Sequence, residues 1–354
     1  MRQPAHGGNL AWAAALAGCP PDAILDFSAS ISPLGPPNSA IAAILSQLGN
    51  LKHYPDPNYS ELRLALSHFH QLPPEWILPG NGSAELLTLV GRELAQLAAT
   101  ILITPAFGDY YRTLAAYNAN VLECPLSFVT GHWSLTKDKG QRTKDKGLLL
   151  NNPHNPTGKI FSRDSILPYL EQYALVVVDE AFMDFVPPNE EQSLIPVVQE
   201  YANLVILRSL TKFYSLPGLR LGYAIAHPDC LAKWQLWRDP WPVNTLAAAA
   251  AIAALQDTEF QQRTWAWLPP ARNQLFQGLA EIPGLQPQAS AANFLLVESQ
   301  ESILQLQQKL LKKHQILIRD CLSFKELGDR FFRVAVRQES DNQRLLTALT
   351  GHGA

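Results

Sequence analysis

Short apolar runs recur through the middle of the chain, and their apolar residues do not alternate with polar ones. The runs cover residues 100–103, 148–150, 175–178, 204–207 and 221–225. Such runs are typical of strands that are covered on both faces of a sheet. Segments with helical spacing of apolar residues, such as residues 83–97, lie between several of them. This alternation predicts an α/β fold with a mostly parallel sheet.

The pattern changes near residue 261. Long amphipathic helices follow, with strands expected at residues 294–297, 316–318 and 331–336. This part is predicted to form a smaller α+β domain. Residues 234–254, rich in Trp and then in Ala, are expected to form the helical connection between this domain and the α/β domain. We therefore expect a large domain of residues 46–240, and a small domain built from residues 1–45 and 241–354.

One polar stretch carries a short repeat. Thr-Lys-Asp-Lys-Gly occurs at residues 136–140 and again at residues 143–147. We expect these residues to form a duplicated surface loop that has no function of its own.

The composition excludes several classes of protein. The chain has 354 residues, of which 47% are hydrophobic and 17% charged, which suits a compact protein of two domains. A formal net charge of −3 gives no general attraction to nucleic acid or to an anionic membrane. The Ala-rich runs are too short to span a bilayer, and the four cysteines form no C-x-x-C pair. We expect a cytoplasmic protein without a metal site and without nucleic-acid or membrane partners.

Two charged residues follow buried strands of the predicted sheet. Asp179 ends the run at residues 175–178, and ligands of open α/β sheets bind at the carboxyl ends of strands. The alternative for Asp179 is a helix N-cap. Lys212 follows the next strand, where burial could lower the pKa of its amino group enough for attack on an aldehyde. The alternative for Lys212 is a solvated surface position.

Groups suited to a phosphate ester lie around these two residues in the sequence. Ser209 and Arg220 could supply a hydroxyl and a fixed charge. Residues 79–85, Pro-Gly-Asn-Gly-Ser-Ala-Glu, join a strand to a helix start, where free N–H groups attract an anion. Asn155, in Asn-Asn-Pro-His-Asn-Pro-Thr-Gly, could reach a phenolic oxygen or simply cap a turn.

Together these motifs resemble a known family. Asn-Pro-Thr-Gly at residues 155–158, Asp-Glu-Ala-Phe at 179–182, Ser-Leu-Thr-Lys at 209–212 and then Arg220 occur in the order found in the fold-type I pyridoxal-5′-phosphate (PLP) enzymes of the class I and II aminotransferase group. The resemblance covers essentially the whole chain. It implies PLP as cofactor and the fold-type I architecture, with a large domain around a mostly parallel sheet and a smaller α+β domain.

The resemblance also implies roles for individual residues. Lys212 binds the cofactor covalently and then serves as acid or base, and Asp179 pairs with the pyridinium nitrogen, which makes both catalytic. Asn155 bonds the ring oxygen and Tyr110 stacks on the ring. The implied phosphate ligands are Gly82, Ser83, Ala84, Ser209 and Arg220. Tyr54 matches a tyrosine that reaches the cofactor phosphate from a neighbouring subunit, which implies a homodimer; the alternative is packing beside a Pro turn.

The N-terminal residues are similar to one branch of the group, the threonine-phosphate decarboxylases of cobalamin biosynthesis. The similarity rests on His6-Gly7-Gly-Asn and on residues 25–37, although Ser30 and Ser32 stand where that branch has Asn. Phe182 and the sequence Arg333-Val-Ala-Val-Arg, which begins in the expected strand at residues 331–336, are similar to the same branch. The implied reaction is decarboxylation of O-phospho-L-threonine to 1-amino-2-propanol phosphate.

Two alternatives remain at this point. A histidinol-phosphate aminotransferase, or a related aminotransferase, would use the same cofactor and break a different bond at Cα. A non-catalytic PLP-fold protein with a binding or regulatory role is disfavoured by the joint presence of Lys212, Asp179 and Arg220. Arg319 and Arg333 suit a substrate with a carboxylate and a phosphate, although surface salt bridges are the commoner fate of an arginine. The expected substrate-binding residues are His6, Gly7, Ser30, Asn155, Arg319 and Arg333.

Overall fold

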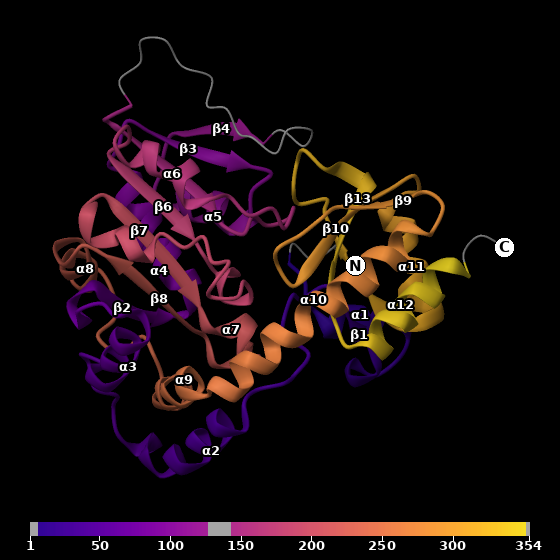
Figure 1. Ribbon diagram of the computed structural model, residues 1–354, viewed down its shortest axis with the longest axis horizontal. Helices are drawn as coiled ribbons and strands as arrows, with labels where there is room; N and C mark the ends of the chain where they lie inside the picture. Colours follow the sequence, from indigo (N-terminus) through magenta and orange to yellow (C-terminus); the bar gives the residue numbers. More distant parts are fainter. Residues whose placement is uncertain (1–5, 127–142, 352–354) are drawn as a thin grey trace.

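The computed structural model describes residues 6–126 and 143–351, which form a larger and a smaller part, and no sheet is shared between the two (Figure 1). The larger part holds a seven-stranded sheet in the order β2-β8-β7-β6-β5-β3-β4. Only β8 runs antiparallel to its neighbours, so the mostly parallel sheet predicted from the sequence is confirmed. The strands are β2 Ile77–Asn81, β3 Ala99–Thr104, β4 Val121–Pro125, β5 Lys146–Asn151, β6 Leu175–Asp179, β7 Leu204–Ser209 and β8 Leu221–Ala226.

Helices cover both faces of this sheet, which explains why its strands are apolar without alternation. Leu149 and Val177 pack on one side with α4 and α5, whereas Leu148 and Val176 pack in the core on the other side. The helix expected at residues 83–97 is α4. The helices of this part are α3 Ser60–His70, α4 Gly82–Leu94, α5 Gly108–Ala116, α6 Arg163–Leu170, α7 Leu210–Phe213, α8 Pro228–Gln235 and α9 Thr245–Gln256.

The smaller part carries two short sheets. One is antiparallel in the order β12-β13-β10-β9, and the other pairs β1 with β11. The single strand expected at residues 316–318 is therefore two strands in different sheets. The elements are β1 Leu25–Asp26, β9 Leu285–Pro287, β10 Phe294–Ser299, β11 Ile316–Leu317, β12 Arg319–Asp320 and β13 Phe331–Ala335, with helices α1 Leu10–Ala17, α11 Ile303–His314 and α12 Glu339–Thr350.

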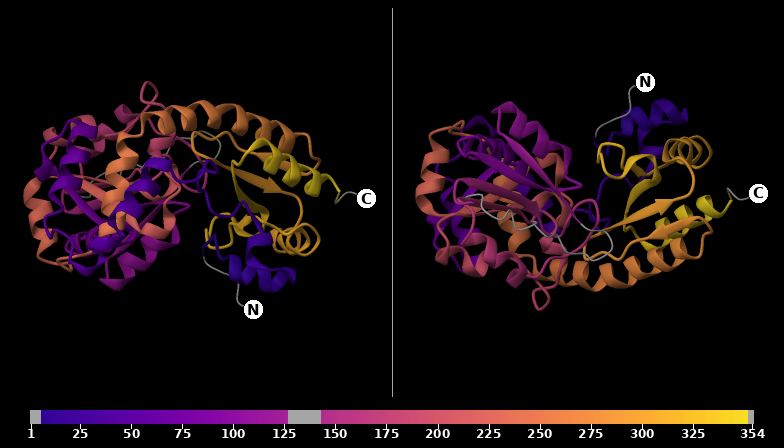
Figure 2. Two further views of the ribbon diagram at one scale, coloured as in Figure 1. Left: turned by 90° about the horizontal axis from the view of Figure 1, so that it is seen from below. Right: turned by 90° about the horizontal axis from the view of Figure 1, so that it is seen from above.

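The link between the two parts differs from the expected one. Residues 234–254 do not form one helix, because α8 ends at Gln235 and α9 begins at Thr245. Pro240 and Pro242 lie between them and are poor helix formers. The helix that runs from one part to the other is α10, Thr258–Ala280 (Figure 2). Helix α2, Asn38–Gln47, packs against α9 beside the larger part (Figure 1). The domain limits at residues 45 and 241 stay a prediction.

The second copy of the repeat is not only a surface loop. Lys146 and Gly147 belong to β5, and Lys146 is buried. The first copy lies outside the described residues. Within the described part of the chain, no helix combines the length and the apolar character needed to cross a membrane.

Three neighbouring parallel strands end at the same edge of the large sheet. Their last residues are Asn151 of β5, Asp179 of β6 and Ser209 of β7, and Asn151 lies in register with Asp179. Lys212 follows β7 directly, in the short helix α7. The fold therefore brings Asn151, Asp179, Ser209 and Lys212 to the same edge of the large sheet.

Candidate active site

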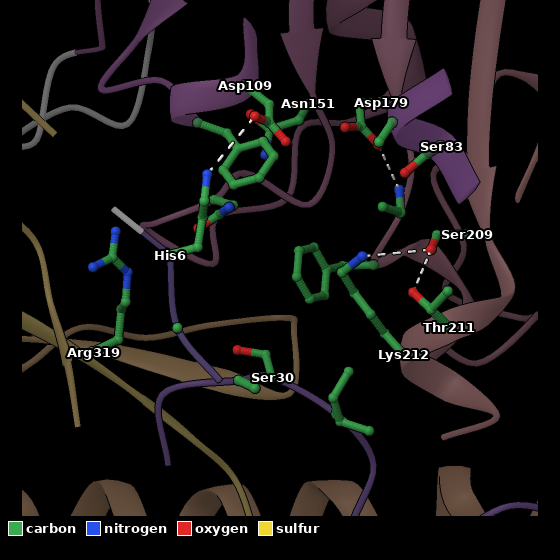
Figure 3. A pocket seen from close by; sticks show the side chains of 18 of the residues that line it. His6, Ser30, Ser83, Asp109, Asn151, Asp179, Ser209, Thr211, Lys212 and Arg319 are labelled. Carbon is green, nitrogen blue, oxygen red and sulfur yellow. Dashed lines mark hydrogen bonds and ion pairs between the residues drawn. The ribbon is translucent and has the colours of Figure 1, made fainter. Parts of the chain in front are cut away.

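A pocket at this edge of the large sheet is lined by residues from both parts of the molecule (Figure 3). The large part contributes Ser83, Ala84, Tyr110, Asn155, Asp179, Ser209, Lys212 and Arg220, and the rest of the chain contributes His6, Gly7, Ser30, Arg319 and Arg333. Residues far apart in the sequence thus meet around Lys212. Of the site residues predicted from the sequence, Gly82 and Tyr54 are not among those that line it.

Lys212 lies inside the pocket. Its ammonium donates a hydrogen bond of 3.4 Å to Ser209 Oγ and lies 5.1 Å from the centre of the Phe182 ring. Burial lowers the pKa of the Lys212 amino group, while the Asp179 carboxylate opposes that shift. A buried amine with a lowered pKa is a better nucleophile toward a carbonyl group than a solvated lysine is.

Asp179 is buried opposite Lys212, with each carboxylate oxygen engaged. Oδ1 accepts a hydrogen bond of 3.0 Å from the backbone N–H of Ala181, and Oδ2 accepts one of 2.8 Å from the hydroxyl of Tyr110. Burial raises the pKa of Asp179, and the Tyr110 hydrogen bond and the charge of Lys212 counteract it. One oxygen therefore fixes the turn after β6, while the other faces the groups of the pocket.

An anion cradle lies at the start of α4. Gly82 has a φ of +71°, and a Cβ there would lie 2.6 Å from Arg220 Nη2, so only glycine lets the guanidinium approach this closely. Ser83 and Ala84 follow in the first helical turn, where backbone N–H groups and the helix dipole favour an anion. Ser209 Oγ lies 2.8 Å from Thr211 Oγ1, which adds two hydroxyls nearby. This donor set suits a phosphate ester.

Two buried arginines enter the pocket from the smaller part. Arg319 and Arg333 lie directly opposite each other on β12 and β13. Arg333 donates to Asn155 Oδ1 and to the carbonyl of Ser28, and its guanidinium lies 4.8 Å from the centre of the Phe294 ring. Burial lowers the pKa of Arg333 to about 10, and the neighbouring Arg319 adds to the shift. Like charges this close indicate a place for an anionic ligand group.

The N-terminal segment closes one side of the pocket. His6 Nε2 lies 3.8 Å from Asp109 Oδ1, and the His6 ring is 5.6 Å from that of Phe107. Gly8 N donates to Ser28 Oγ at 2.7 Å. The buried hydroxyl of Ser30 has no hydrogen-bond partner among the described residues. A ligand oxygen in the pocket would satisfy it.

Comparison with known proteins identifies the family. The model of the family "Aminotransferase class I and II" matches residues 22–349. The chain belongs to the class I and II aminotransferase family.

Two curated relatives and one solved structure show which proteins this chain is similar to within the family. The chain is 40% identical over 352 residues to threonine-phosphate decarboxylase of Salmonella typhimurium, covering 98% of this chain and 95% of the relative. It is 30% identical to an adenosylcobalamin biosynthesis bifunctional protein of Leptospira interrogans, covering 99% of this chain and 41% of that one. The crystal structure of histidinol-phosphate aminotransferase from Clostridium acetobutylicum has a TM-score of 0.86 and 29% identity, covering 93% of this chain and 99% of that one.

The residues of this aminotransferase-family site fit the PLP implied by the sequence resemblance. The cradle of Gly82, Ser83 and Arg220 suits the phosphate, and Lys212 lies within the same pocket for the aldehyde. Asp179 offers a carboxylate that can pair with a ring nitrogen, and Asn155 offers an amide for the ring oxygen.

Several residues of the pocket escaped the sequence analysis. They include Asn151, Thr211, Asp109, Phe107 and Phe324. The position of Asn151 at the end of an apolar run, like that of Asp179, was a usable signal. Phe107 and Asp109 lie just before Tyr110 in the sequence. Phe324 comes from a loop in which no sequence pattern marks it.

Tyr54 lies away from this pocket. Its side chain is 78% exposed and stacks on the ring of Trp241, with ring centres 4.4 Å apart. Tyr54 does not line the pocket of its own chain, and the role across a subunit interface that the family resemblance implies stays a prediction.

Proposed function

We propose that this member of the class I and II aminotransferase family is a PLP-dependent threonine-phosphate decarboxylase, which converts O-phospho-L-threonine to 1-amino-2-propanol phosphate in cobalamin biosynthesis. The observation that carries the proposal is the buried pair of Arg319 and Arg333 in the pocket of Lys212. The Salmonella and Leptospira relatives support the choice of substrate and pathway. A cytoplasmic location is part of the same proposal.

Residues of the chain divide the work around the cofactor. PLP, when bound, withdraws electrons from the substrate's Cα. Asp179 holds a proton at the ring nitrogen, and Lys212 anchors the cofactor and afterwards moves a proton at Cα. Asn155 accepts from Arg333 through Oδ1, which leaves its amide nitrogen to donate to the ring oxygen. Gly82, Ser83, Ala84, Ser209 and Arg220 hold the phosphate of the cofactor.

The two arginines suit the two anionic ends of O-phospho-L-threonine. Arg333 contacts Asn155, so it lies near the cofactor ring, and we assign it to the substrate carboxylate. Arg319 donates to Ser323 Oγ at 2.6 Å on the same wall, and we assign it, with His6, Gly7 and Ser30, to the substrate phosphate. A guanidinium binds either group bidentately. Held at both anionic ends, the substrate would keep its carboxylate in one fixed orientation, and bound PLP would supply the electron-withdrawing chemistry that favours loss of that group.

The proposal is tested with two substrates. Purified protein loaded with PLP is incubated with O-phospho-L-threonine alone, and separately with histidinol phosphate and 2-oxoglutarate. Release of CO2 from the first mixture only is the expected result. Glutamate formed in the second mixture only would replace the decarboxylase with an aminotransferase, the function suggested by the Clostridium acetobutylicum structure.

The covalent role of Lys212 has its own test. Wild-type protein with PLP should absorb in the visible and lose that absorption with borohydride, whereas Lys212→Ala should lack the borohydride-fixed label and turnover. Because Lys212 contributes no large apolar side chain to the core, the variant should keep its thermal transition. Retained turnover in Lys212→Ala would contradict this role.

We also propose a homodimer that completes the site with Tyr54 of the second subunit. The exposure of Tyr54 and its distance from its own pocket support a role across an interface. Exposed apolar side chains nearby, Leu45, Leu48 and Leu51, suit a covered face. Mixing Tyr54→Ala with Lys212→Ala should restore activity through hybrid dimers that contain one intact site. A monomer in sedimentation, or no restoration, would contradict this arrangement.

A further inference from the structure

A buried cluster of charged residues lies directly behind the pocket and takes no part in the chemistry assigned above. It consists of Arg208, Glu180, Asp184, Glu191 and Ser193, which we call the Arg208 cluster. None of its members lines the pocket. Arg208 precedes Ser209 on β7, and Glu180 follows Asp179 at the end of β6. Two members of the cluster, Arg208 and Glu180, are therefore each bonded directly in the chain to a residue of the site.

Arg208 joins three carboxylates that all lie within the stretch that follows β6, residues 180–191. Its side chain is 2% exposed, with Nε 3.0 Å from Glu180 Oε2, Nη1 2.5 Å from Asp184 Oδ1 and Nη2 2.5 Å from Glu191 Oε1. Nη2 also donates to Ser193 Oγ at 3.0 Å. Ser193 in turn donates to Glu180 Oε2 at 2.6 Å, and Leu194 N donates to Oε1 at 2.9 Å. Nη1 and Nη2 are thus held by hydrogen bonds, whereas Nε makes no hydrogen bond and meets Glu180 only as an ion pair.

Such a cluster is costly to bury, because taking ionised groups out of water often outweighs their attraction. Apolar side chains of similar size would often pack at least as stably. A buried arginine with three carboxylates is therefore poorly explained by stability alone. What it provides is a fixed geometry between the ends of two strands, because charge-assisted hydrogen bonds are directional.

The cluster also reaches the helix that joins the two parts of the molecule. Trp265 of α10 donates from Nε1 to the carbonyl of Asp184 at 2.8 Å, and its ring lies 5.8 Å from that of Phe213, next to Lys212. Gln261 of α10 donates to the hydroxyl of Tyr214 at 3.2 Å. Helix α10 leads to the part that carries Arg319 and Arg333 (Figure 2). The same set of contacts thus joins the strand ends to the helix that leads to the smaller part.

We infer that Arg208 is a positioning residue, which locks the ends of β6 and β7 so that Asp179 and the Ser209–Lys212 turn hold the cofactor in reactive geometry. This inference rests on the proposed function only in that PLP is the ligand. It does not depend on which bond at Cα breaks. A shift of about 1 Å in reacting groups can cost about 100-fold in rate, so loosening the strand ends should act on turnover without any direct contact.

The test compares Arg208→Gln and Glu180→Gln with a control that is destabilised elsewhere. Leu345→Ala serves as the control, because Leu345 is fully buried in α12 on the outer side of the smaller part (Figure 1). For each variant, the thermal midpoint of the cofactor-free protein is measured first. The Kd for PLP, kcat and KM are then measured at a temperature well below that midpoint. We expect both cluster variants to weaken PLP binding about tenfold and to lower kcat about 100-fold with little change in KM. Leu345→Ala should lower only the thermal midpoint.

Two further variants keep the test decisive if Arg208→Gln does not fold. Glu191→Gln changes a partly exposed member, and Trp265→Phe removes the N–H that Asp184 accepts while keeping a ring. Both should weaken PLP binding in the same direction by a smaller factor. The double variant Arg208→Gln/Glu180→Gln should be less impaired than the sum of the single effects, because the two residues act as one unit. Wild-type PLP affinity and kcat in all variants that fold would overturn the inference.

A failure of the proposed function would look different. If wild-type protein released no CO2 from O-phospho-L-threonine, the substrate would be wrong, yet the PLP affinities of the cluster variants would still test Arg208. The two outcomes are therefore separable.

Discussion

The hydroxyl of Tyr110 donates a hydrogen bond of 2.8 Å to Oδ2 of Asp179 within the pocket of Lys212. The family resemblance implied a stacking role for Tyr110 and said nothing about this bond. Burial raises the pKa of Asp179, and the Tyr110 bond counteracts that rise. Tyr110 therefore helps Asp179 to stay ionised, which is the state that the proposed role of Asp179 requires.

Replacing Tyr110 by Phe should move the acid limb of the activity profile. Loss of the hydrogen bond leaves burial less opposed, so the pKa of Asp179 rises and the carboxylate is protonated at a higher pH. We expect kcat/KM on the acid side of the optimum to fall about tenfold, with a smaller loss at alkaline pH. Tyr117→Phe, at the end of the same helix, is the matched control. An acid limb that does not move in Tyr110→Phe would show that the bond does not govern Asp179.

The two arginines should give unequal losses. Arg319→Ala should lower kcat/KM for O-phospho-L-threonine about 30- to 100-fold, mainly through KM, because one charge-assisted contact is lost. Arg333→Ala should lower kcat as well, because Arg333 also binds Asn155 Oδ1 and so orients that amide. Steady-state kinetics measure both effects, with the PLP affinity as a check that the cofactor remains bound. Equal kinetics for the two variants would argue against their separate assignments.

The N-terminal segment can be tested with a single methyl group. A Cβ at Gly7 would lie 2.3 Å from the carbonyl oxygen of Ser28, so Gly7→Ala must displace the segment from the pocket wall. Substrate KM should rise and kcat fall, whereas PLP binding at Lys212 should not change. Gly351→Ala, where a Cβ meets no atom closer than 3.6 Å, is the control. Unchanged kcat/KM in Gly7→Ala would remove the segment from the substrate site.

Glu180 should give the stability of the cofactor-free protein a specific pH dependence. Burial raises the pKa of Glu180 from 4.5 to about 7, against the opposing charge of Arg208. The folded state then binds this proton more tightly than the unfolded state does, so the contribution is greatest below pH 4.5 and is lost as the pH rises to about 7. The thermal midpoint of Glu180→Gln relative to wild type should therefore increase from pH 4.5 to 7. Glu171→Gln, at an exposed position, is the control, and a constant difference for Glu180→Gln would contradict the shift.

The sequence predicted the fold and the chemical centre because both depend on local patterns. Apolar runs without alternation marked the strands covered on both faces, and Asp179 was visible because it ends such a run. Lys212 was singled out by its position after the next strand, and Arg220 by its charge and its place shortly after Lys212 in the sequence. The predicted helical link at residues 234–254 was wrong, because the prolines at 240 and 242 interrupt it and the long helix begins only at Thr258.

The rest of the site depends on contacts between distant segments, which no local pattern records. Arg208 and Glu180 have the appearance of ordinary charged residues beside strand ends, and only the fold brings Arg208 to Glu180, Asp184 and Glu191. Phe324 enters the pocket from a loop of the smaller part. The role proposed for Tyr54 depends on a second copy of the chain, which no pattern within one chain can record.

The central claim is that the bond between Cα and the carboxylate breaks. The most direct measurement follows O-phospho-L-threonine labelled with ¹³C in its carboxyl group, in D2O, by NMR. Decarboxylation predicts one labelled CO2 per substrate consumed, and an amine product that keeps its original Cα hydrogen and gains a single carbon-bound deuterium in place of the carboxylate. Label that stays in a keto acid, with the Cα hydrogen lost, would contradict the account and indicate transamination.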